Sequence, residues 1–319
     1  MYDWNRILHI MVDEIDERIK SHDDEALTLK SLSKRLGYSE FHATRKFREV
    51  SGMYLGDYIR LRKLAFALID VRDTKDNFFD IAVKYGFGSH EAFTRSFKKA
   101  YGVTPKKYRQ NLLPVVLRTK LSIFDRFFFG LEEIGMVKST NEVKVYFITL
   151  PAHRYLHIKN YESNGYWDFW KKQEKIPGQD WDTICGLLDS IKGNLDSNDD
   201  VLFKFSGQVM ARIYEKKGKI AEGYGIRLSK NFNGPIPENM LMLEIPEMDY
   251  IVFEHGPFDY EQENETVEKK LKDAELSFDY SETKYKLDTS PGRIGYFYHI
   301  PASFKKRLQP VMKIDCKEV

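Results

Sequence analysis

Two stretches of sequence, fifty residues apart, share one pattern: GYSEFHATRKFREVSG at residues 37–52 and FGSHEAFTRSFKKAYG at residues 87–102. Each copy has a Ser near its start, an Arg and a Phe two positions apart in its middle, and a Gly at its end. The recurring pairs are Ser39 and Ser89, Thr44 and Thr94, Arg45 and Arg95, Phe47 and Phe97, Arg48 and Lys98, Gly52 and Gly102, and Tyr58 and Tyr108. A constant offset over so many positions indicates a duplicated structural unit.

The local chemistry of each copy predicts a helix, a tight turn and a second helix. Apolar residues recur at helical spacing, Gly follows as a helix stop, and Ser stands where a new helix needs an N-cap. In the first copy these residues are Leu29, Leu32, Leu36, Gly37 and Ser39. In the second copy they are Phe78, Ile81, Ala82 and Tyr85, then Gly86 and Gly88, then Ser89. We therefore predict two helix-turn-helix units.

A single helix is predicted between the two copies, from Met53 to about Val71. Its buried side is expected to be Leu55, Ile59, Leu64, Leu68 and Ile69. Roughly 18 residues would span ~27 Å in a helix, and successive major-groove faces of B-DNA recur about every 34 Å. A rigid helix of this length can therefore hold two recognition helices against neighbouring turns of one duplex, and the DNA site need not be palindromic.

The positive charge of the chain is concentrated in this first third. Residues 28–110 contain 18 Lys and Arg against 8 Asp and Glu, a net charge of +10. The rest of the chain has 32 against 40, a net charge of −8, which together give the formal +2 of the whole chain. Such a segregated basic segment is typical of a part that neutralises phosphates.

These residues resemble the DNA-binding domain of AraC/XylS-type regulators with an N-terminal DNA-binding domain. The resemblance covers about Asn5 to Gln110 and rests on the two copies quoted above, on Tyr85-Gly86-Phe87, and on Gly102-Val103-Thr104-Pro105 with Tyr108. It implies that double-stranded DNA is contacted by Phe41, His42, Thr44, Arg45, Ser89, His90, Thr94 and Arg95. Phe47 and Phe97 are expected in the core, because each follows an outward-pointing Arg by two positions.

The composition of the chain changes after about residue 142. β-Branched and aromatic runs at strand spacing appear at residues 143–148 and 294–300, and helical patterns appear at 166–175, 182–193 and 260–274. This mixture predicts an α+β domain. A weaker repeat at an offset of 95 relates Pro151, Tyr155 and Ile158 to Pro246, Tyr250 and Phe253, which predicts two related β-rich halves with a groove between them.

This second part resembles the GyrI-like effector-binding domain, on the Pro151 and Pro246 strands, residues 254–258 and the closing strand before Pro301. The resemblance implies a flat, often cationic ligand held between aromatic rings and opposed by a carboxylate. The candidate ligand-binding residues are Tyr166, Trp167, Trp170, Trp181, Tyr224, Tyr296 and Tyr298. Core packing is the alternative role for Trp167, Trp170, Tyr296 and Tyr298. The closing strand has no Asp or Glu, which opens the alternative of a neutral aromatic ligand; Glu254 and Asp279 are the possible replacements.

Several classes of function have no support in the sequence. Cys185 and Cys316 are 131 positions apart, and neither has a Cys or His at metal-ligand spacing, so neither a disulfide scaffold nor a zinc site is predicted. His153 and His157 share a strand face without a companion ligand, so no metal or other cofactor is expected. We find no nucleophile elbow, no phosphate-binding Gly loop and no His-Glu-x-x-His. The absence of a leader and of long apolar runs predicts a cytoplasmic protein away from membranes.

We therefore predict a multidomain protein: an all-α DNA-binding domain at residues 1–112, a linker or interdomain segment at 113–142, and an α+β domain at 143–319. The predicted function is a DNA-binding transcription regulator, not an enzyme, whose second domain binds a small aromatic effector. The alternatives are that the second domain is a small-molecule hydrolase or a module that binds a protein such as RNA polymerase. The aromatic patch from Phe124 to Phe129 is expected to be buried against the chain itself or to form a subunit contact.

Overall fold

The computed structural model describes residues 2–23, 27–35, 39–118, 120–121, 143–196, 207–256, 258, 260–281, 283–300 and 304–314. The chain divides into two compact units. A helical unit comprises Met1–Glu132 together with Asp182–Ile191, and a β-rich unit comprises Glu133–Trp181 together with Lys192–Val319. None of the helices within the described ranges is long and apolar enough to cross a membrane. The predicted patch from Phe124 to Phe129 lies outside the described residues, as do Leu36 and Gly37.

The helical unit contains the two predicted helix-turn-helix pairs. Its helices are α1 (Tyr2–Lys20), α2 (Leu29–Arg35), α3 (Glu40–Ser51), α4 (Leu55–Asp73), α5 (Phe78–Lys84), α6 (His90–Tyr101), α7 (Pro105–Gln110) and all but the first residue of α10 (Trp181–Ser190). The pair α2 and α3 and the pair α5 and α6 confirm the duplication. Phe47 and Phe97 are fully buried, as predicted.

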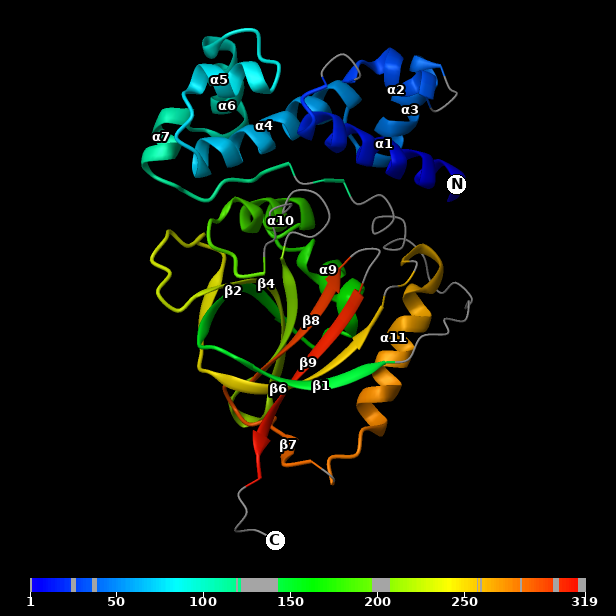
Figure 1. Ribbon diagram of the computed structural model, residues 1–319, viewed down its shortest axis with the longest axis vertical. Coiled ribbons are helices and arrows are strands. Elements are labelled where there is room, and N and C mark those ends of the chain that lie inside the picture. The colour runs from blue at the N-terminus through cyan, green and yellow to red at the C-terminus, as the bar shows by residue number, and fades with distance from the viewer. Residues whose placement is uncertain are drawn as a thin grey trace. The chain divides into compact units, whose positions relative to one another are not determined.

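Helix α4 is the strut between the two pairs, and Figure 1 shows it running from the α2 and α3 side to the α5 and α6 side. It confirms the predicted connecting helix, displaced by two residues. The prediction of its buried side was partly wrong, since Ile59 and Ile69 are only half-buried while Arg62 is fully buried. The reason is that α4 contacts α1, α3, α5, α6 and α7, so it buries several sides rather than one stripe.

The buried Arg62 forms an ion pair with Asp16 of α1. Its Nε donates to Asp16 Oδ1 at 2.8 Å and its Nη2 to Asp16 Oδ2 at 2.5 Å, and both side chains are inaccessible to solvent. The third donor, Nη1, reaches the carbonyl of Arg118 at 2.6 Å. Burial alone would lower the pKa of Arg62, but the Asp16 carboxylate outweighs it and raises that pKa. The guanidinium therefore stays charged and fixes α1 and residue 118 on α4.

Replacing Asp16 by Ala should destabilise the helical unit strongly, because it leaves the Arg62 charge buried and uncompensated. The expected loss is roughly 3–5 kcal/mol of unfolding free energy. The double variant Asp16→Leu with Arg62→Met should recover most of that loss, because no buried charge remains. Urea unfolding followed by helical circular dichroism measures both. A midpoint for Asp16→Ala equal to the wild type would contradict this account of the pair.

The β-rich unit is built on one sheet. Its strands are β1 (Lys144–Leu150), β2 (His153–Tyr161), β3 (Val209–Tyr214), β4 (Ile220–Ser229), β5 (Leu241–Ile245), β6 (Met248–His255), β7 (Tyr285–Leu287), β8 (Ile294–Ile300) and β9 (Phe304–Lys313). Among the described residues they form a nine-stranded sheet in the order β1-β6-β9-β8-β3-β4-β2-β5, with β7 on β9, and every pairing is antiparallel. Helices α9 (Gly165–Gln173) and α11 (Tyr260–Ser277) and the short 3₁₀ turn η2 (Lys216–Gly218) complete the unit.

The strand order is symmetric. Exchanging β1 with β5, β2 with β6, β3 with β8 and β4 with β9 reverses the order and leaves it otherwise unchanged. The weak repeat at an offset of 95 falls on the two corners that this exchange relates, β1 to β2 and β5 to β6. Tyr155 and Tyr250, the related aromatics, are both fully buried in one core cluster. The unit therefore consists of two halves with the same topology, each lending an edge strand to the other.

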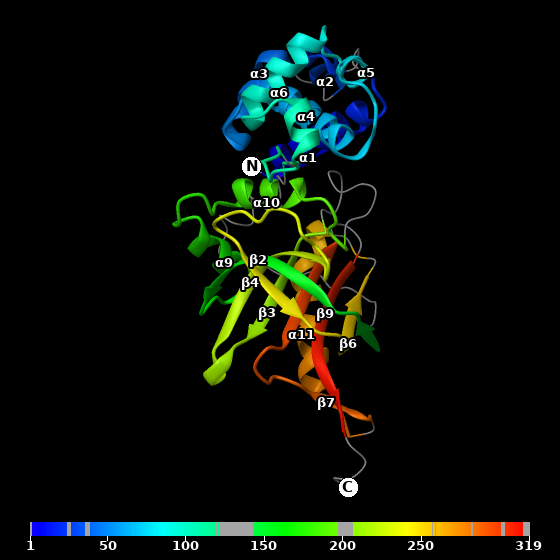
Figure 2. The ribbon, with the colours of Figure 1, turned by 90° about the vertical axis from the view of Figure 1, so that its left-hand side faces the viewer.

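Helix α11 packs on one face of β6 and β9. Its Val267 and Leu271 contact Ile251 and Phe253 of β6, whose intervening residue Val252 faces the central core on the other side. Figure 2 shows α11 beside the β6, β7 and β9 part of the sheet.

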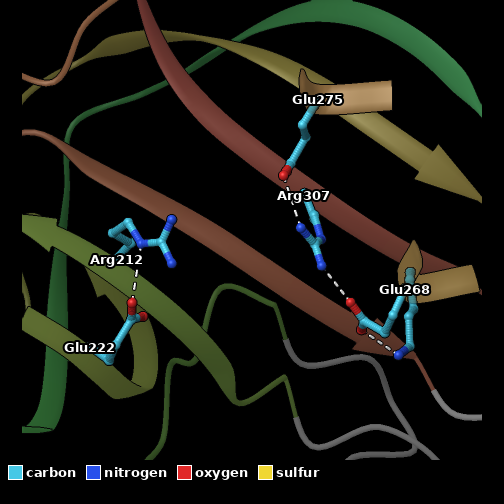
Figure 3. Close-up of polar contacts among 6 residues, drawn as sticks. Arg212, Glu222, Glu268, Glu275 and Arg307 are labelled. Carbon is cyan, nitrogen blue, oxygen red and sulfur yellow. Dashed lines mark hydrogen bonds and ion pairs between the residues drawn. The ribbon is translucent and has the colours of Figure 1, made fainter. Parts of the chain in front are cut away.

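Charged side chains add to this contact. Arg307 of β9 lies between two carboxylates of α11, donating to Glu275 Oε2 at 2.8 Å and to Glu268, which also binds Lys305 (Figure 3). Burial would raise the pKa of Glu268, but Lys305 and Arg307 lower it to about 2. For Glu275, burial outweighs Arg307, and its pKa is raised above 4.5. The pKa values of two carboxylates two turns apart on one helix are thus shifted in opposite directions.

Glu268 should stabilise the β-rich unit at neutral pH and lose that effect in acid. Because its folded pKa lies below the ordinary value of 4.5, the stabilisation is complete above that pH and disappears as the pH falls towards about 2. The side chain is 45% exposed, so solvent screens the pairs and the effect should be no more than about 1 kcal/mol.

Glu268→Gln should therefore lower the urea midpoint at pH 7 and lower it by much less near pH 2.5, where most of the stabilisation is already lost. Glu275→Gln is the matched control, since it removes a carboxylate on the same helix that binds the same Arg307 but has a raised pKa. It should cost less at pH 7 than Glu268→Gln does. Equal losses for the two variants at both pH values would refute the assignment.

Candidate functional site

The second helices of the two pairs, α3 and α6, have the same local structure. Ser39 and Ser89 are their N-caps, accepting hydrogen bonds from the backbone N–H of His42 at 3.3 Å and of Ala92 at 3.1 Å. Gly52 and Gly102 end them in the left-handed region with φ of 76° and 73°, a conformation that favours glycine. The order of buried, half-buried and exposed positions is the same over residues 41–50 and 91–100. The structure therefore presents two equivalent helix faces.

The predicted arginines lie on these exposed faces. The Arg45 side chain is 55% exposed and its Nε lies 3.7 Å from Glu49 Oε1, one turn later on α3. Arg95 is exposed at the equivalent place on α6. Phe41 is 76% exposed, an unusual position for a phenyl ring in a helix that has Phe47 in the core. These three side chains have the exposure that a DNA contact needs.

The other predicted DNA contacts are partly occupied by local structure. The hydroxyl oxygens of Thr44 and Thr94 are buried inside the protein, and the hydroxyl of Ser89 is engaged in its cap. His90 is exposed and stacks on Phe78, with ring centroids 6.4 Å apart, whereas His42 is half-buried. Arg45, Arg95, Phe41 and His90 are therefore the stronger candidates.

The basic residues that follow the arginines recur in the two copies, but the sequence pattern did not assign them to the DNA contact. Arg48 is exposed on α3, and its Nη1 donates to the hydroxyl of Tyr54 at 2.7 Å. Lys98 and Lys99 are exposed on α6. Positions 45 and 48, like 95 and 98, are one helical turn apart, so each face carries a basic pair. The signal that could have identified them is this i, i+3 spacing of basic residues after each N-cap.

Comparison with known proteins agrees with this geometry. The family described as a helix-turn-helix domain matches residues 32–111. The regulatory protein SoxS of Salmonella typhimurium is 36% identical over 107 residues, which are 34% of this chain and 96% of SoxS. The chain belongs to the AraC family of regulators. It is thus a DNA-binding transcription regulator.

Other relatives of this AraC-family chain match a similar length of it. The transposon Tn10 TetD protein of Escherichia coli is 40% identical over 95 residues, 30% of this chain and 69% of TetD. The transcriptional regulator Rob of Salmonella typhimurium is 39% identical over 93 residues, 29% of this chain and 32% of Rob. A solved structure of the C-terminal domain of AraT, a response regulator from Geobacillus stearothermophilus, is 25% identical, covers 33% of this chain and 84% of that one, and has a TM-score of 0.30.

In the β-rich unit of the regulator, five of the seven predicted ligand-binding residues come together. We name the aromatic cluster as Tyr166, Trp167 and Trp170 of α9, Trp181, and Tyr224 of β4. Trp170 is fully buried and stacks on Trp181, with ring centroids 5.7 Å apart and an angle of 12° between the ring planes. Tyr166, Trp167 and Trp181 are half-buried. The cluster thus has two buried members, Trp170 and Tyr224, and three members that solvent reaches.

The remaining two residues, Tyr296 and Tyr298, lie in a different cluster on the opposite face of the sheet. Arg227 of β4 lies over both rings, at 5.7 and 5.9 Å, and it points away from Tyr224 because strand residues alternate in direction. Its Nε and Nη2 bind Asp196 at 2.8 and 2.5 Å, and Tyr298 donates to the same carboxylate at 3.2 Å. One site cannot include all seven predicted residues.

The carboxylates expected to oppose a cationic ligand are engaged elsewhere. Glu254 accepts from Tyr146 at 2.7 Å and binds Lys306 at 2.8 Å, and Asp279 accepts the backbone N–H of Ser281 at 2.8 Å. Sequence reasoning missed Glu222 of β4, which is buried on the same strand face as Tyr224 and has a pKa raised by burial. A charged residue inside a strand of small and apolar residues is the signal that could have identified it.

Alanine variants should separate the core member of the aromatic cluster from its surface members. Trp170→Ala should cost roughly 3–5 kcal/mol of unfolding free energy, because it removes a fully buried large side chain. Trp167→Ala should cost no more than about half of that, because the side chain already contacts solvent. Thermal unfolding of the full chain measures both, and the reverse order would show that Trp167 is the core residue.

Proposed function

We propose that α3 and α6 enter successive major-groove faces of one DNA duplex, with Arg45 and Arg95 contacting base edges. The supporting observation is that two helices with the same caps and burial are joined by α4, which has 19 residues and so a length of ~28 Å. This length is close to the repeat of about 34 Å between groove faces, once the width of each unit is added. The basic side chains one turn further along each helix supply phosphate contacts.

The two faces differ in a way that favours an asymmetric DNA site. Position 41 is an exposed Phe, whereas the equivalent position 91 is an exposed Glu. An apolar side chain in the major groove contacts the methyl group of thymine, and a carboxylate accepts a hydrogen bond from the amino group of cytosine. We expect the half-site read by α3 to be richer in thymine and the half-site read by α6 to contain cytosine.

Arg45→Ala and Arg95→Ala should each weaken binding of the full chain to a duplex selected from a random pool. An arginine that contacts guanine should cost about 10- to 100-fold in affinity and relax the sequence preference at one half-site, since each such contact contributes ~1–3 kcal/mol. An arginine that contacts phosphate would instead weaken all duplexes alike and reduce the salt dependence. Fluorescence anisotropy at several salt concentrations distinguishes the two.

The control is Lys171→Ala, which removes one exposed positive charge from α9 in the other unit. It should leave affinity and salt dependence unchanged. Failure of the wild-type chain to select any duplex would sink the proposal, as would normal binding by both arginine variants.

We further propose that the β-rich unit binds a small planar aromatic effector on the exposed edges of Tyr166, Trp167 and Trp181. Three half-buried rings in mutual contact, supported from beneath by the buried Trp170, form a preorganised apolar surface. The GyrI-like resemblance of the sequence agrees with such a role.

The carboxylates on α9 and β4 are already paired with basic side chains, which favours a neutral ligand. The carboxylate of Asp168, on the same helix as Tyr166 and Trp167, lies 3.0 Å from Lys172 Nζ. Glu222, which shares a strand face with Tyr224, has its Oε1 3.1 Å from Arg212 Nε (Figure 3). A cationic ligand would have to compete with Lys172 and Arg212 for these carboxylates. A neutral aromatic ring needs only stacking and dispersion contacts. We therefore expect a neutral aromatic effector to bind more tightly than a cationic one of the same shape.

A thermal-shift screen of the full chain with paired neutral and cationic planar aromatics should yield a neutral compound that raises the melting temperature. The shift should be lost in Trp167→Ala and kept in Tyr298→Phe, which alters only the cluster on the opposite face of the sheet. Loss of the shift in Tyr298→Phe alone would place the ligand there instead and overturn the proposed site.

A further inference from the structure

The segment after α7 runs along the strut helix α4. The backbone N–H of Leu121 donates to the hydroxyl of Tyr58 at 3.1 Å, and the carbonyl of Arg118 accepts from Arg62 at 2.6 Å. Val115, Leu117 and Leu121 are buried, and Leu117 is only 2% exposed. Residues predicted to be a linker are thus packed as an additional layer of the helical unit.

Helix α10 packs on this segment although it follows it in sequence by some sixty residues. The backbone N–H of Leu117 donates to the carbonyl of Gly186 at 3.2 Å, and that of Val115 donates to Ser190 Oγ at 3.0 Å. Arg118 Nη1 lies 3.2 Å from the carboxylate of Asp182. Positions 182, 186 and 190 are four residues apart, so one face of α10 makes all these contacts.

The approach of α10 to the segment depends on the absence of a side chain at Gly186. A Cβ atom there would lie 2.4 Å from the carbonyl oxygen of Leu117 and 2.9 Å from its nitrogen. Both atoms belong to the backbone, so the contact could not adjust without separating the two segments.

The far end of α10 reaches α4 directly. Arg72, in the last turn of α4, donates from Nη1 to the carbonyl of Ser190 at 3.2 Å. A cation at this position also interacts favourably with the negative end of the α10 dipole. Together with Tyr58 and Arg62, this gives contacts along α4 from Tyr58 to Arg72, or ~21 Å of its length.

We propose that residues 182–190 of α10, together with residues 113–118 and 120–121, form a brace that holds α4 straight and thereby sets the spacing of the two recognition helices. We name these residues the brace. Because α4 is the helix that connects the two helix-turn-helix units along the chain, a bend in it changes the distance between α3 and α6. Binding to a duplex with two half-sites requires one fixed distance between α3 and α6. Binding to a duplex with a single half-site does not depend on that distance. The brace therefore contributes to affinity for the complete site and not to affinity for a half-site.

The brace also links the effector surface to DNA binding, an extension that rests on the effector function proposed above. Trp181 is the first residue of α10 and a member of the aromatic cluster, while the rest of the helix belongs to the brace. Backbone hydrogen bonds join Trp181 to the next turn of this helix, so a displacement of Trp181 acts on the start of α10. An effector that displaces Trp181 would thus shift α10 and lower affinity for the complete site.

Gly186→Ala tests the brace. Alanine favours the helical state more than glycine does, so α10 itself should be kept while its contact with Leu117 is lost. The expected result for the full chain is roughly 5- to 10-fold weaker binding to a duplex with both half-sites and unchanged binding to a duplex with one. Gly56→Ala is the matched control, because it makes the same change at an exposed position of α4. Nothing lies within 4 Å of the added Cβ there, so this variant should alter neither affinity.

Arg118→Ala is a second variant that adds no volume. It removes the contact with Asp182 and should show the same selective loss, to a smaller extent. Wild-type affinity for the two-site duplex in both variants would overturn the proposal, and so would equal losses on the two duplexes.

A distance measurement between labels on Glu49→Cys and Lys99→Cys, with Cys316 replaced by Ser, reports the helix spacing without DNA. Cys185 is buried. The distribution should be narrow in the parent and broad in Gly186→Ala, and an unchanged distribution would contradict the brace. A separate experiment tests the effector extension. A bound aromatic compound should weaken binding to the two-site duplex in the wild type and not in Trp181→Ala. If no compound binds, the effector proposal fails while these ligand-free measurements still decide the brace.

Discussion

The ion pair between Arg62 and Asp16 is the interaction on which the DNA-binding geometry depends. A buried ion pair costs desolvation energy that apolar residues in its place would not cost. Its main contribution is therefore to fix the positions of the elements that it joins. The guanidinium has donors in a fixed plane. Two of them hold α1, and the third holds the segment that carries α10. One side chain in the middle of the strut therefore determines how three parts of the helical unit pack.

Both units of the regulator are built by duplication, but the duplicated parts meet in different ways. The two helix-turn-helix pairs are kept apart by α4, so each recognition helix stays exposed and can contact a separate turn of DNA. The two halves of the sheet exchange edge strands and share one core, in which Tyr155 and Tyr250 are related positions. The first arrangement provides two separated surfaces, and the second provides one rigid body.

Strand geometry explains why the aromatic residues do not form a single site. Tyr224 and Arg227 are three positions apart on β4, so they point to opposite faces of the sheet. Tyr224 joins the Trp170 and Trp181 cluster, while Arg227 lies over Tyr296 and Tyr298. The aromatic cluster and a largely buried polar cluster can thus be built on the same strand, one on each face of the sheet.

The sequence alone was sufficient for what depends on local chemistry. The caps at Ser39 and Ser89, the glycine stops, the buried Phe47 and Phe97 and the length of α4 all follow from short-range spacing, because helix caps and helical periodicity involve residues within one or two turns. Only the tertiary structure decided what depends on partners far apart in the chain. Asp16 pairs with Arg62, Trp170 packs on Tyr224, and Gly186 contacts Leu117, which are pairs 46, 54 and 69 positions apart. The tertiary structure also buries Trp170 while it leaves its neighbour Trp167 half-buried. No local pattern encodes such partners, since a buried charge and an exposed one have the same spacing in sequence.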